Sequence, residues 1–381
     1  MHSLYIHIPF CKQACHYCDF HFSTTLKRKS EMVSSICKEL ILRKQEASNS
    51  QLQTIYFGGG TPSILSFEEL KTILQTIYEN YNISPNAEVT LEANPDDFFR
   101  DSSSPTQLLS NLKQLGINRL SIGVQSFYEE DLRLMNRAHN ATQSELLLLE
   151  APKFFDNITI DLIYGIPNMT DERWQTNIRK ALSFGVPHIS AYALTIEPKT
   201  ALHKFIALGK VPNVNEQQAH SHFVSMISIL EKEGFIHYEF SNFGKEGYFS
   251  RNNTAYWFGK KYIGIGPSAH SFNGTERSWN VANNIKYIEQ IQKGIIPAEK
   301  EILSQNDRYN ELIITRIRTM IGISVEEVET TFGKKYTDYL LLQAKKHITN
   351  GLLTINNKHL ITTTKGKFLS DGITADLFIV D

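Results

Sequence analysis

The stretch Tyr5–Phe20, YIHIPFCKQACHYCDF, contains three of the four cysteines of this 381-residue chain. Cys11, Cys15 and Cys18 have the spacing C-x3-C-x2-C and follow a short apolar run, Leu4–Ile8, that is typical of a β-strand. Three thiolates on one short loop suit three corners of a four-iron cluster, whose remaining iron is then open to a ligand other than cysteine. The stretch therefore predicts an iron–sulfur site at the end of the first strand.

The three cysteines also have alternative uses. A disulfide requires an oxidising compartment, and the N-terminus, MHSLYIHIPF, is too short and too quickly polar for a secretory signal. A zinc site with His16 or His21 as fourth ligand stays open, although structural zinc sites usually assemble from two separated ligand pairs. Unliganded core cysteines are the third interpretation. The fourth cysteine, Cys37, lies in a helical pattern and is expected to be a small core residue.

The cysteine spacing, with the aromatic Tyr17 directly before the last cysteine, resembles that of the radical S-adenosylmethionine (SAM) superfamily. The flanking YIHIPFC is similar to the branch that holds the oxygen-independent coproporphyrinogen III oxidases and a group of haem chaperones. The resemblance implies that the amine and carboxylate of SAM bind the open iron. It also implies that reduction of the cluster can cleave SAM and release a 5′-deoxyadenosyl radical.

Length and composition predict a globular protein of two or three domains. Hydrophobic residues make up 41% and charged residues 21% of the chain, as is usual for soluble proteins. The net charge of −1 gives no indication of nucleic acid or an acidic membrane surface as a partner. No apolar run approaches the roughly 20 residues that a transmembrane helix needs. We therefore expect a cytoplasmic protein.

Strand-like runs alternate with helix-like stretches over residues 1–200. The expected strands are Leu4–Ile8, Thr54–Phe57, Glu88–Glu92, Arg119–Val124, Ile158–Ile163 and Ile189–Leu194. The expected helices cover 27–47, 67–80, 105–115, 140–152 and 171–184. This alternation predicts a parallel sheet with right-handed crossovers. Six units are too few for an eight-fold barrel and suit a partial (β/α)6 barrel, which is the fold that the resemblance implies.

The rest of the chain is expected to form an α+β extension over 201–306 and a separate C-terminal block over 307–381. The extension contains a helical pattern at 217–232 and a strand-like run at 235–240. In the last block, two helical stretches precede a hairpin with its turn at Asn356-Asn357, an order that looks like a winged-helix domain. The hairpin carries few basic residues, and nucleic-acid binding is not expected.

Distinctive residues stand at the C-terminal end of each expected strand, where barrel folds of this kind place their chemistry. Three consecutive glycines, Gly58–Gly60, allow close approach of the backbone to a ligand, although such a run is more often only a turn. Glu92 and Asp161 are carboxylates in apolar strands, where burial is costly unless they are paired or hydrogen-bonded. Both are therefore candidates for function, with a structural salt bridge as the alternative for Glu92.

The resemblance implies specific contacts with SAM at these strand ends. The turn with Gly59, Gly60 and Thr61 would hold the amino group of SAM, and Glu92 would bond the ribose hydroxyls. The other expected SAM contacts are Tyr5, Ala193 and His270. The residues that match a second SAM site, seen in the oxidases, are Gln125, Arg137 and Asp161. The alternatives are a core aromatic for Tyr5 and a surface helix charge for Arg137.

Three departures from the oxidases favour the haem chaperones of this branch. Phe20 stands where the oxidases have a fourth cysteine, and little chain precedes Cys11 where the oxidases carry an N-terminal arm. The segment Asn253-x-x-Tyr256-Trp257 resembles the chaperone signature His-Asn-x-x-Tyr-Trp, but its histidine is Asn252 here. An amide is a poor substitute for imidazole as an iron ligand, so His237 or His270 is left as a candidate, with no sequence reason to choose.

We therefore expect a haem chaperone with a [4Fe–4S] cluster and SAM as cofactors. Its expected partners are haem as cargo, a haem-requiring acceptor protein and, if SAM is cleaved, an electron donor. The alternatives are an oxygen-independent coproporphyrinogen III oxidase and another radical reaction on a substrate that the sequence does not name. No catalytic residue is assigned, and the resemblance leaves open whether SAM is cleaved in function.

Overall fold

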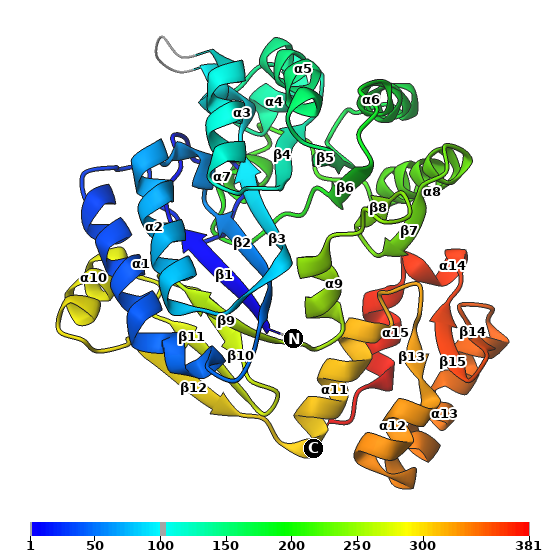
Figure 1. Ribbon diagram of the computed structural model, residues 1–381. Coiled ribbons are helices and arrows are strands. Elements are labelled where there is room, and N and C mark those ends of the chain that lie inside the picture. The colour runs from blue at the N-terminus through cyan, green and yellow to red at the C-terminus, as the bar shows by residue number, and fades with distance from the viewer. Residues whose placement is uncertain (1, 100–103, 381) are drawn as a thin grey trace.

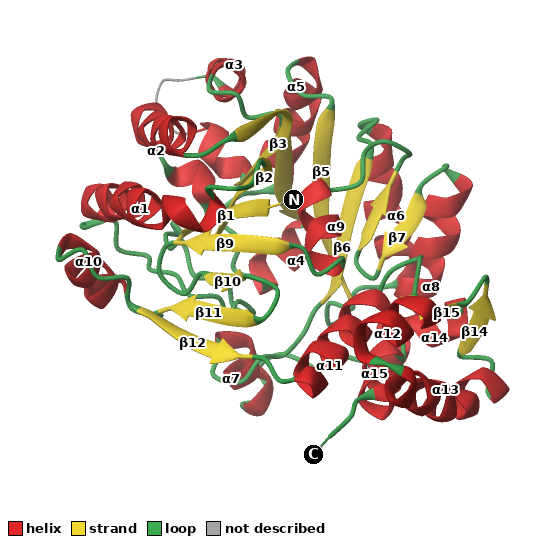
Figure 2. Cartoon of the chain, turned by 60° about the horizontal axis from the view of Figure 1, so that its bottom comes forward, coloured by secondary structure: helices red, strands yellow, loops and turns green. Residues whose placement is uncertain are grey.

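The computed structural model describes residues 2–99 and 104–380, and a long curved sheet forms its centre (Figures 1 and 2). Six parallel strands stand side by side in the order β1-β2-β3-β4-β5-β6. They are β1 (His2–Ile8), β2 (Leu52–Gly59), β3 (Ile83–Ala93), β4 (Arg119–Gln125), β5 (Asn157–Tyr164) and β6 (His188–Ala193). Each overlaps one of the six expected strands, and the α/β fold with a partial (β/α)6 barrel is confirmed.

Helices join these strands and cover the outer face of the sheet (Figure 2). They are α1 (Lys29–Arg43), α2 (Phe67–Asn80), α3 (Pro105–Gln114), α4 (Glu129–Leu134), α5 (Ala141–Glu150) and α6 (Asp171–Ser183). Short 3₁₀ turns cover Lys44–Ala47, Pro62–Ile64, Pro95–Phe99 and Ala151–Lys153. The sequence missed α4 because six residues are too few to show a helical period. None of the helices within the described ranges is long and apolar enough to span a membrane.

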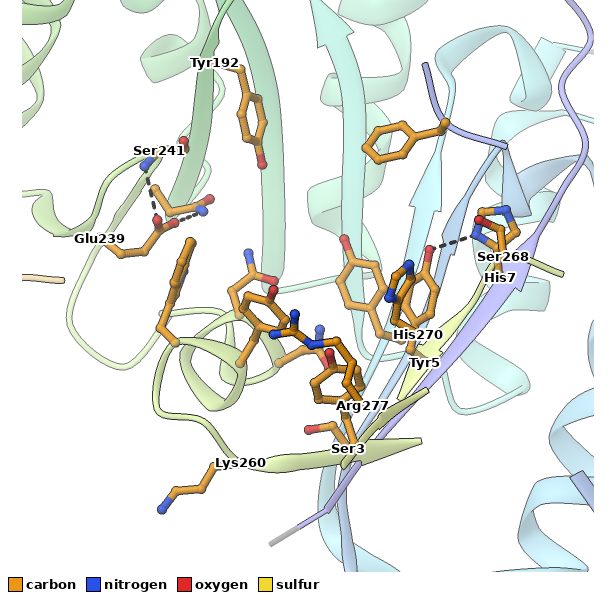
Figure 3. Close-up of a pocket in the computed structure, with 18 of the residues that line it drawn as sticks. Ser3, Tyr5, His7, Tyr192, Glu239, Ser241, Lys260, Ser268, His270 and Arg277 are labelled. Atoms are coloured by element: carbon orange, nitrogen blue, oxygen red, sulfur yellow. Dashed lines mark hydrogen bonds between the residues drawn. The ribbon is translucent and has the colours of Figure 1, made fainter. Parts of the chain in front are cut away.

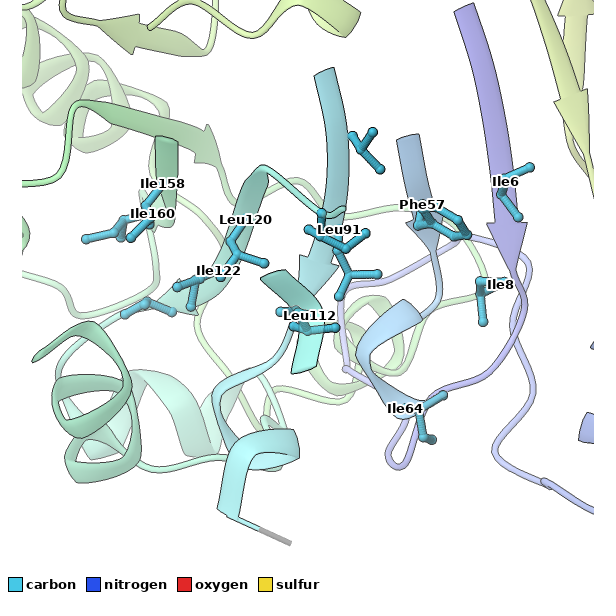
Figure 4. Packing of buried hydrophobic residues seen from close by; sticks show 14 of the residues in the cluster. Ile6, Ile8, Phe57, Ile64, Leu91, Leu112, Leu120, Ile122, Ile158 and Ile160 are labelled. Carbon is cyan, nitrogen blue, oxygen red and sulfur yellow. The ribbon is translucent and has the colours of Figure 1, made fainter. Parts of the chain in front are cut away.

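Side chains alternate along the strands between an apolar outer layer and a polar interior. On β1, the outer residues include Leu4 and Ile6, which belong to the main hydrophobic cluster, whereas Tyr5 and His7 line an internal cavity. Outer residues of the other strands include Phe57, Leu91, Leu120, Ile122, Ile158 and Ile160 (Figure 4). Parallel strands that are buried on both faces usually read as continuous apolar runs. The alternation therefore identifies an interior that is hollow and polar.

Strands from the region after residue 200 extend the central sheet at both edges. The full order is β12-β11-β10-β9-β1-β2-β3-β4-β5-β6-β8-β7, with β9 parallel to β1 and β8 antiparallel to β6. The added strands are β7 (Ile236–Glu239), β8 (Asn242–Gly244), β9 (Lys261–Ile265), β10 (His270–Phe272), β11 (Glu276–Asn280) and β12 (Ala298–Ile302). The helices here are α7 (Ala201–Ala207), α8 (Glu216–Lys232), α9 (Arg251–Trp257) and α10 (Asn284–Gln292).

A buried carboxylate on α1 ties this extension to the barrel. Glu39 accepts hydrogen bonds from Arg43 Nη1 at 3.3 Å and from the Gly266 N–H at 2.8 Å. It also accepts them from Asn280 Nδ2 at 2.7 Å and from the Tyr287 hydroxyl at 2.6 Å. Because a buried charge is costly unless it is paired and hydrogen-bonded, these contacts hold α1, β11, α10 and the segment after β9 together.

The short helix α9 packs against the N-terminal half of the barrel. The Glu88 carboxylate on β3 accepts the N–H groups of Arg251 and Asn252, each at 3.1 Å, at the helix N-terminus where a negative charge is favourable. Thr54 Oγ1 on β2 donates to Asn252 Oδ1 at 3.0 Å. Asn252, which stands in place of the signature histidine, is thus fixed at the base of the barrel interior.

The C-terminal block has a hydrophobic cluster of its own, which contains residues from Tyr309 to Leu377. Its helices are α11 (Gln305–Arg316), α12 (Val325–Phe332), α13 (Lys334–Thr349), α14 (Thr364–Lys367) and α15 (Ser370–Leu377). Its three-stranded antiparallel sheet contains β13 (Ile323–Ser324), β14 (Leu353–Asn356) and β15 (His359–Thr362). Helices followed by a hairpin confirm the winged-helix-like arrangement. The separate cluster agrees with a boundary near 307, and the three domain ranges stay a prediction.

Candidate functional site

The three cysteines lie on a loop between β1 and α1 whose two ends are hydrogen-bonded together. The Cys11 N–H donates to Ser23 O at 3.1 Å, and the Ser23 N–H donates to Pro9 O at 2.9 Å. Within the loop, the Cys18 N–H donates to Cys15 O at 3.4 Å. All three thiols are free and partly exposed. The loop thus presents three available sulfur ligands from a closed base, and this donor set fits the predicted cluster.

Two side chains from outside the cysteine loop donate hydrogen bonds to the thiols, Thr61 from the turn after β2 and Arg137 from the segment between α4 and α5. Thr61 Oγ1 lies 3.4 Å from Cys11 Sγ, and Arg137 Nη1 lies 3.2 Å from Cys15 Sγ. Burial raises the pKa of Cys11 and of Cys18 to about 11. Iron must therefore displace protons from these thiols, and both donors favour the thiolate that remains.

Each histidine of the zinc alternative uses one ring nitrogen for a hydrogen bond within the fold. His16 Nδ1 is hydrogen-bonded to Leu134 O at 2.8 Å, and its ring packs edge-on against Phe205. His21 Nε2 is hydrogen-bonded to Asn284 Oδ1 at 2.7 Å. In the part of the chain that the structure describes, no three His, Cys, Asp or Glu side chains form a cage for one metal ion. The geometry gives the zinc interpretation no support.

The glycine-rich turn after β2 packs tightly against the base of the cysteine loop. The Gly60 N–H donates to Ile8 O at 2.9 Å. A Cβ at Gly60 would lie 2.7 Å from Phe10 O and 2.8 Å from Ile8 O. Gly59 has φ +104°, a conformation that favours glycine. The backbone of the glycine turn thus makes its close approach to the base of the chain's own cysteine loop. Its approach to a ligand stays a prediction.

Glu92 stands at the end of β3 without an ion-pair partner among the described residues. It accepts hydrogen bonds from the Tyr56 hydroxyl at 2.8 Å and from the Gly59 N–H at 3.2 Å. Burial, with a further contribution from the charge of Asp161, raises the pKa of Glu92 to about 7. The salt-bridge interpretation of Glu92 is therefore wrong within the described chain, and the carboxylate is free to meet a ligand.

The three residues expected at a second SAM site occupy different surroundings. Asp161 accepts hydrogen bonds from Ser121 Oγ in the barrel interior, and burial raises its pKa to about 7. Gln125 has a left-handed backbone, with φ 66°, at the end of β4. Arg137 contacts Cys15 and also Gly123 O at 3.2 Å. Its Nε is a buried donor without a partner in residues 2–99 and 104–380, as a site for a ligand acceptor would provide.

A cavity of about 740 Å³ opens beside the strands and receives several predicted residues (Figure 3). Its aromatic lining consists of Tyr5, Phe20, Tyr56, Tyr192, Tyr256, Trp257 and Tyr262. Its imidazoles are His7, His21 and His270. Polar and charged side chains make up the rest of the lining. Aromatic faces beside polar groups in a cavity of this size suit a large planar ligand that also carries polar substituents.

Two of the three remaining predicted contacts, Tyr5 and His270, line this cavity. Tyr5 lines it, stacks on Tyr56 with ring centroids 6.1 Å apart, and bonds to His7 Nδ1 at 3.2 Å, so it is not a simple core aromatic. Ala193 ends β6 and packs against the main hydrophobic cluster. His270 begins β10, lines the cavity and keeps an exposed ring.

The sequence did not identify three charged residues of the cavity, Glu239, Lys260 and Arg277 (Figure 3). The sequence could have identified Glu239, because it lies in the apolar run 235–240. Like Asp161, it is a carboxylate whose burial is costly, which makes it a candidate for function. Burial raises the pKa of Glu239 to about 7. Nothing in the sequence indicated that Lys260 and Arg277 line a cavity, because cations in polar segments usually face solvent.

Comparisons with known proteins agree with this geometry. Residues 5–181 match the family model of the radical SAM superfamily, and residues 303–369 match that of the HemN C-terminal domain. The protein of Bacillus subtilis named "Heme chaperone HemW" is 31% identical over 98% of this chain and 98% of its own length. The Lactococcus lactis protein of the same name is 31% identical over 100% of this chain and 97% of its own length.

A solved structure shares the fold. The coproporphyrinogen III oxidase HemN from Escherichia coli superposes with a TM-score of 0.85 at 23% identity, over 99% of this chain and 90% of the oxidase chain. At that identity the likeness supports the fold alone.

Proposed function

The chain belongs to the HemW family of the radical SAM superfamily, and on that premise we propose that it is a haem chaperone. It would hold a [4Fe–4S] cluster and SAM, take up haem as cargo and pass it to a haem-requiring protein. The cavity of about 740 Å³ beside the cysteine loop carries the proposal, because its aromatic side chains suit the faces of a flat ligand and its polar groups suit that ligand's charged edge. We expect the protein to act in the cytoplasm, where its thiols stay reduced.

The residues of the cysteine loop have defined tasks in this proposal. Cys11, Cys15 and Cys18 would hold three irons, while Thr61 and Arg137 donate hydrogen bonds to the thiolates and so stabilise the ligated form. A cluster bound here supplies one electron to SAM when SAM is cleaved, and an electron donor is then required.

The strand ends would position SAM beside that loop. The glycine turn with Gly59 and Gly60 would meet its amino group, and Glu92 its ribose hydroxyls. The further SAM contacts that we propose are Tyr5 and Ala193, with Gln125, Arg137 and Asp161 at a second SAM site. His270 is the remaining SAM contact that the resemblance implies. For Arg137, the unpartnered Nε supports the assignment.

Haem titration of the anaerobically reconstituted protein, run beside a coproporphyrinogen III turnover assay, tests the function. We expect one haem per chain and no protoporphyrinogen. Turnover without haem retention would place the protein with the oxidases despite Phe20. An intact cluster with bound SAM but neither haem binding nor turnover would leave another radical reaction.

Binding of SAM is expected to release protons at pH 7 because of Glu92. The carboxyl group has a pKa of about 7 when no ligand is bound, so about half of the molecules carry the proton. Ribose hydroxyls donate hydrogen bonds and SAM is cationic, so binding favours the carboxylate and lowers its pKa. The affinity for SAM should therefore rise with pH through 7. Calorimetry in two buffers of different ionisation enthalpy measures the released protons.

Two carboxyl variants make this measurement specific. Glu92→Gln should lower the proton release by the share that Glu92 contributes and should weaken SAM binding, whereas the proton that the SAM amine loses on binding iron is released in both proteins. Glu239→Gln is the matched control, because Glu239 also has a pKa of about 7 through burial but is hydrogen-bonded to Asn242 and the Ser241 N–H at the other wall. Equal proton release by wild type and Glu92→Gln would contradict the ribose role of Glu92.

A further inference from the structure

The histidines that line the large cavity differ in whether their ring nitrogens are occupied. His7 uses both, since Nδ1 bonds to the Tyr5 hydroxyl at 3.2 Å and Nε2 to His21 O at 2.9 Å. His21 uses Nε2 for Asn284 Oδ1 at 2.7 Å. Of the three, and within the described residues, only His270 makes no side-chain hydrogen bond.

The other histidine that the sequence offered, His237, is held inside the fold. Its Nε2 bonds to Phe240 O at 3.1 Å, and its Nδ1 lies 2.8 Å from Lys367 Nζ. Its ring stacks on Phe243 with centroids 4.1 Å apart. His237 does not line the large cavity. It therefore has a structural role, and no ring nitrogen is left to bind a metal.

The backbone of His270 is fixed, whereas its ring contacts Trp279, with centroids 6.1 Å apart, and makes no hydrogen bond within the described residues. His270 on β10 pairs with Trp279 on β11. The N–H of Asn280, which follows Trp279 on β11, donates a hydrogen bond to Ala269 O at 2.9 Å. The Glu39 cluster holds the adjoining Gly266 segment. An imidazole that points into a cavity from a rigid strand end is pre-organised for ligation, because little conformational entropy is lost when a ligand binds.

The surroundings of His270 suit a porphyrin with anionic edges. Tyr256, Trp257 and Tyr262 provide aromatic surface, and Tyr256 and Trp257 follow the signature position on α9. Arg277 already has an ion-pair partner in Glu311. Lys260 is exposed at the cavity and makes no ion pair within the described chain, so its ammonium group is available to a carboxylate. The cavity therefore combines a free imidazole, aromatic walls and a free cation.

We propose that His270 is the axial ligand of the haem iron in this chain, in place of the signature histidine that Asn252 has replaced, and that Lys260 pairs with a haem propionate. The inference rests on the proposed haem chaperone function. The lone pair of one imidazole nitrogen forms a coordinate bond to iron and displaces a weakly held ligand such as water. No electron is transferred in this step.

The test uses the full chain, reconstituted with its cluster, and compares wild type with His270→Gly and His21→Ala. Ferric haem is titrated against each protein, and difference spectra against haem-free samples separate the haem bands from those of the cluster. Electron paramagnetic resonance at low temperature reports the nitrogen ligand. We expect wild type to show an imidazole-ligated ferric haem, and His270→Gly to lose that signature and at least about tenfold in haem affinity. His21→Ala, a second cavity histidine, should keep both.

Rescue by added imidazole separates ligation from a structural role. In His270→Gly the missing ring leaves space, so free imidazole should restore the wild-type spectrum, which it does not do for a merely distorted site. Lys260→Gln should weaken haem binding without changing the ligand spectrum. SAM titration of His270→Gly serves as a further readout, because the sequence resemblance assigned His270 to SAM.

The outcomes are distinguishable. An unchanged haem spectrum in His270→Gly, or lost SAM affinity with intact haem ligation, would overturn the assignment of His270 while leaving the chaperone function standing. Absence of stoichiometric haem binding by wild type would overturn both. Loss of the imidazole signature in His21→Ala rather than in His270→Gly would transfer the ligand role to His21.

Discussion

Replacing Cys15 with alanine is expected to remove the iron–sulfur absorption of the anaerobically reconstituted protein, at about 400 nm, together with nearly all of its about four bound irons. Cys15 is one of only three sulfur ligands on the loop, and its thiol is the one that Arg137 contacts at 3.2 Å. Without Cys15, only two of the four irons keep a thiolate from the protein, and we expect the cluster to dissociate. Iron and sulfide analysis with the visible spectrum measures the loss.

Cys37→Ala is the matched control for this experiment. Cys37 is the remaining cysteine, it is also free, and it lies on α1 against the main hydrophobic cluster. The control should keep the full spectrum and iron content. Thermal unfolding of both variants shows whether the fold is intact, since Cys15 lies on a loop outside the buried core. Wild-type iron content in Cys15→Ala would contradict the cluster assignment.

Gly60→Ala is expected to destabilise the protein and to impair cluster loading at the same time. The added Cβ would meet two carbonyl oxygens of the loop base, Phe10 O at 2.7 Å and Ile8 O at 2.8 Å. Both are backbone atoms, which cannot rotate away as a flexible side chain can. Overpacking of this kind costs about 1–3 kcal/mol in free energy of unfolding. Relief of the clash moves either the turn or the loop that carries the cysteines.

Urea denaturation and iron content together measure this effect. Gly372→Ala on α15 is the control, because its Cβ would meet nothing within 4 Å and alanine favours a helix over glycine. The control should be neutral or more stable by up to about 1 kcal/mol and should load iron normally. If Gly60→Ala kept both wild-type stability and full iron content, the turn would not support the cysteine loop as the structure indicates.

The local patterns of the sequence were sufficient for the barrel and for the cysteine loop. Period-two and period-3.6 patterns depend on neighbours a few residues away, so the six strands and most of their helices could be located directly. The capping box at Ser66 and Glu69 is equally local, and both of its hydrogen bonds are present. On β1, polar residues such as Tyr5 and His7 alternate with apolar ones. This alternation in the sequence is itself an indication that one face of the strand lines a polar interior.

Local periodic patterns could not predict which distant segments of the chain pair with each other. Strand β9 joins the sheet beside β1, with Ile263 opposite Leu4, although β1 begins the chain and β9 lies in the extension after residue 200. No local period specifies such a partner, because the choice depends on which edge of the folded sheet remains open. The same is true of Glu88, whose carboxylate caps α9, a helix that the sequence analysis did not expect.

The sequence by itself identified the family, predicted the three sulfur ligands and located the six parallel strands, because the residues that indicate each of these lie close together in the chain. Only the tertiary structure decided between the candidate histidines. His237 and His270 look alike as single polar residues among aromatics. Packing against Phe243 and Lys367 occupies the ring of one, whereas the turn before β10 presents the other to an open cavity. Which nitrogen stays free is a property of the partners that folding brings together.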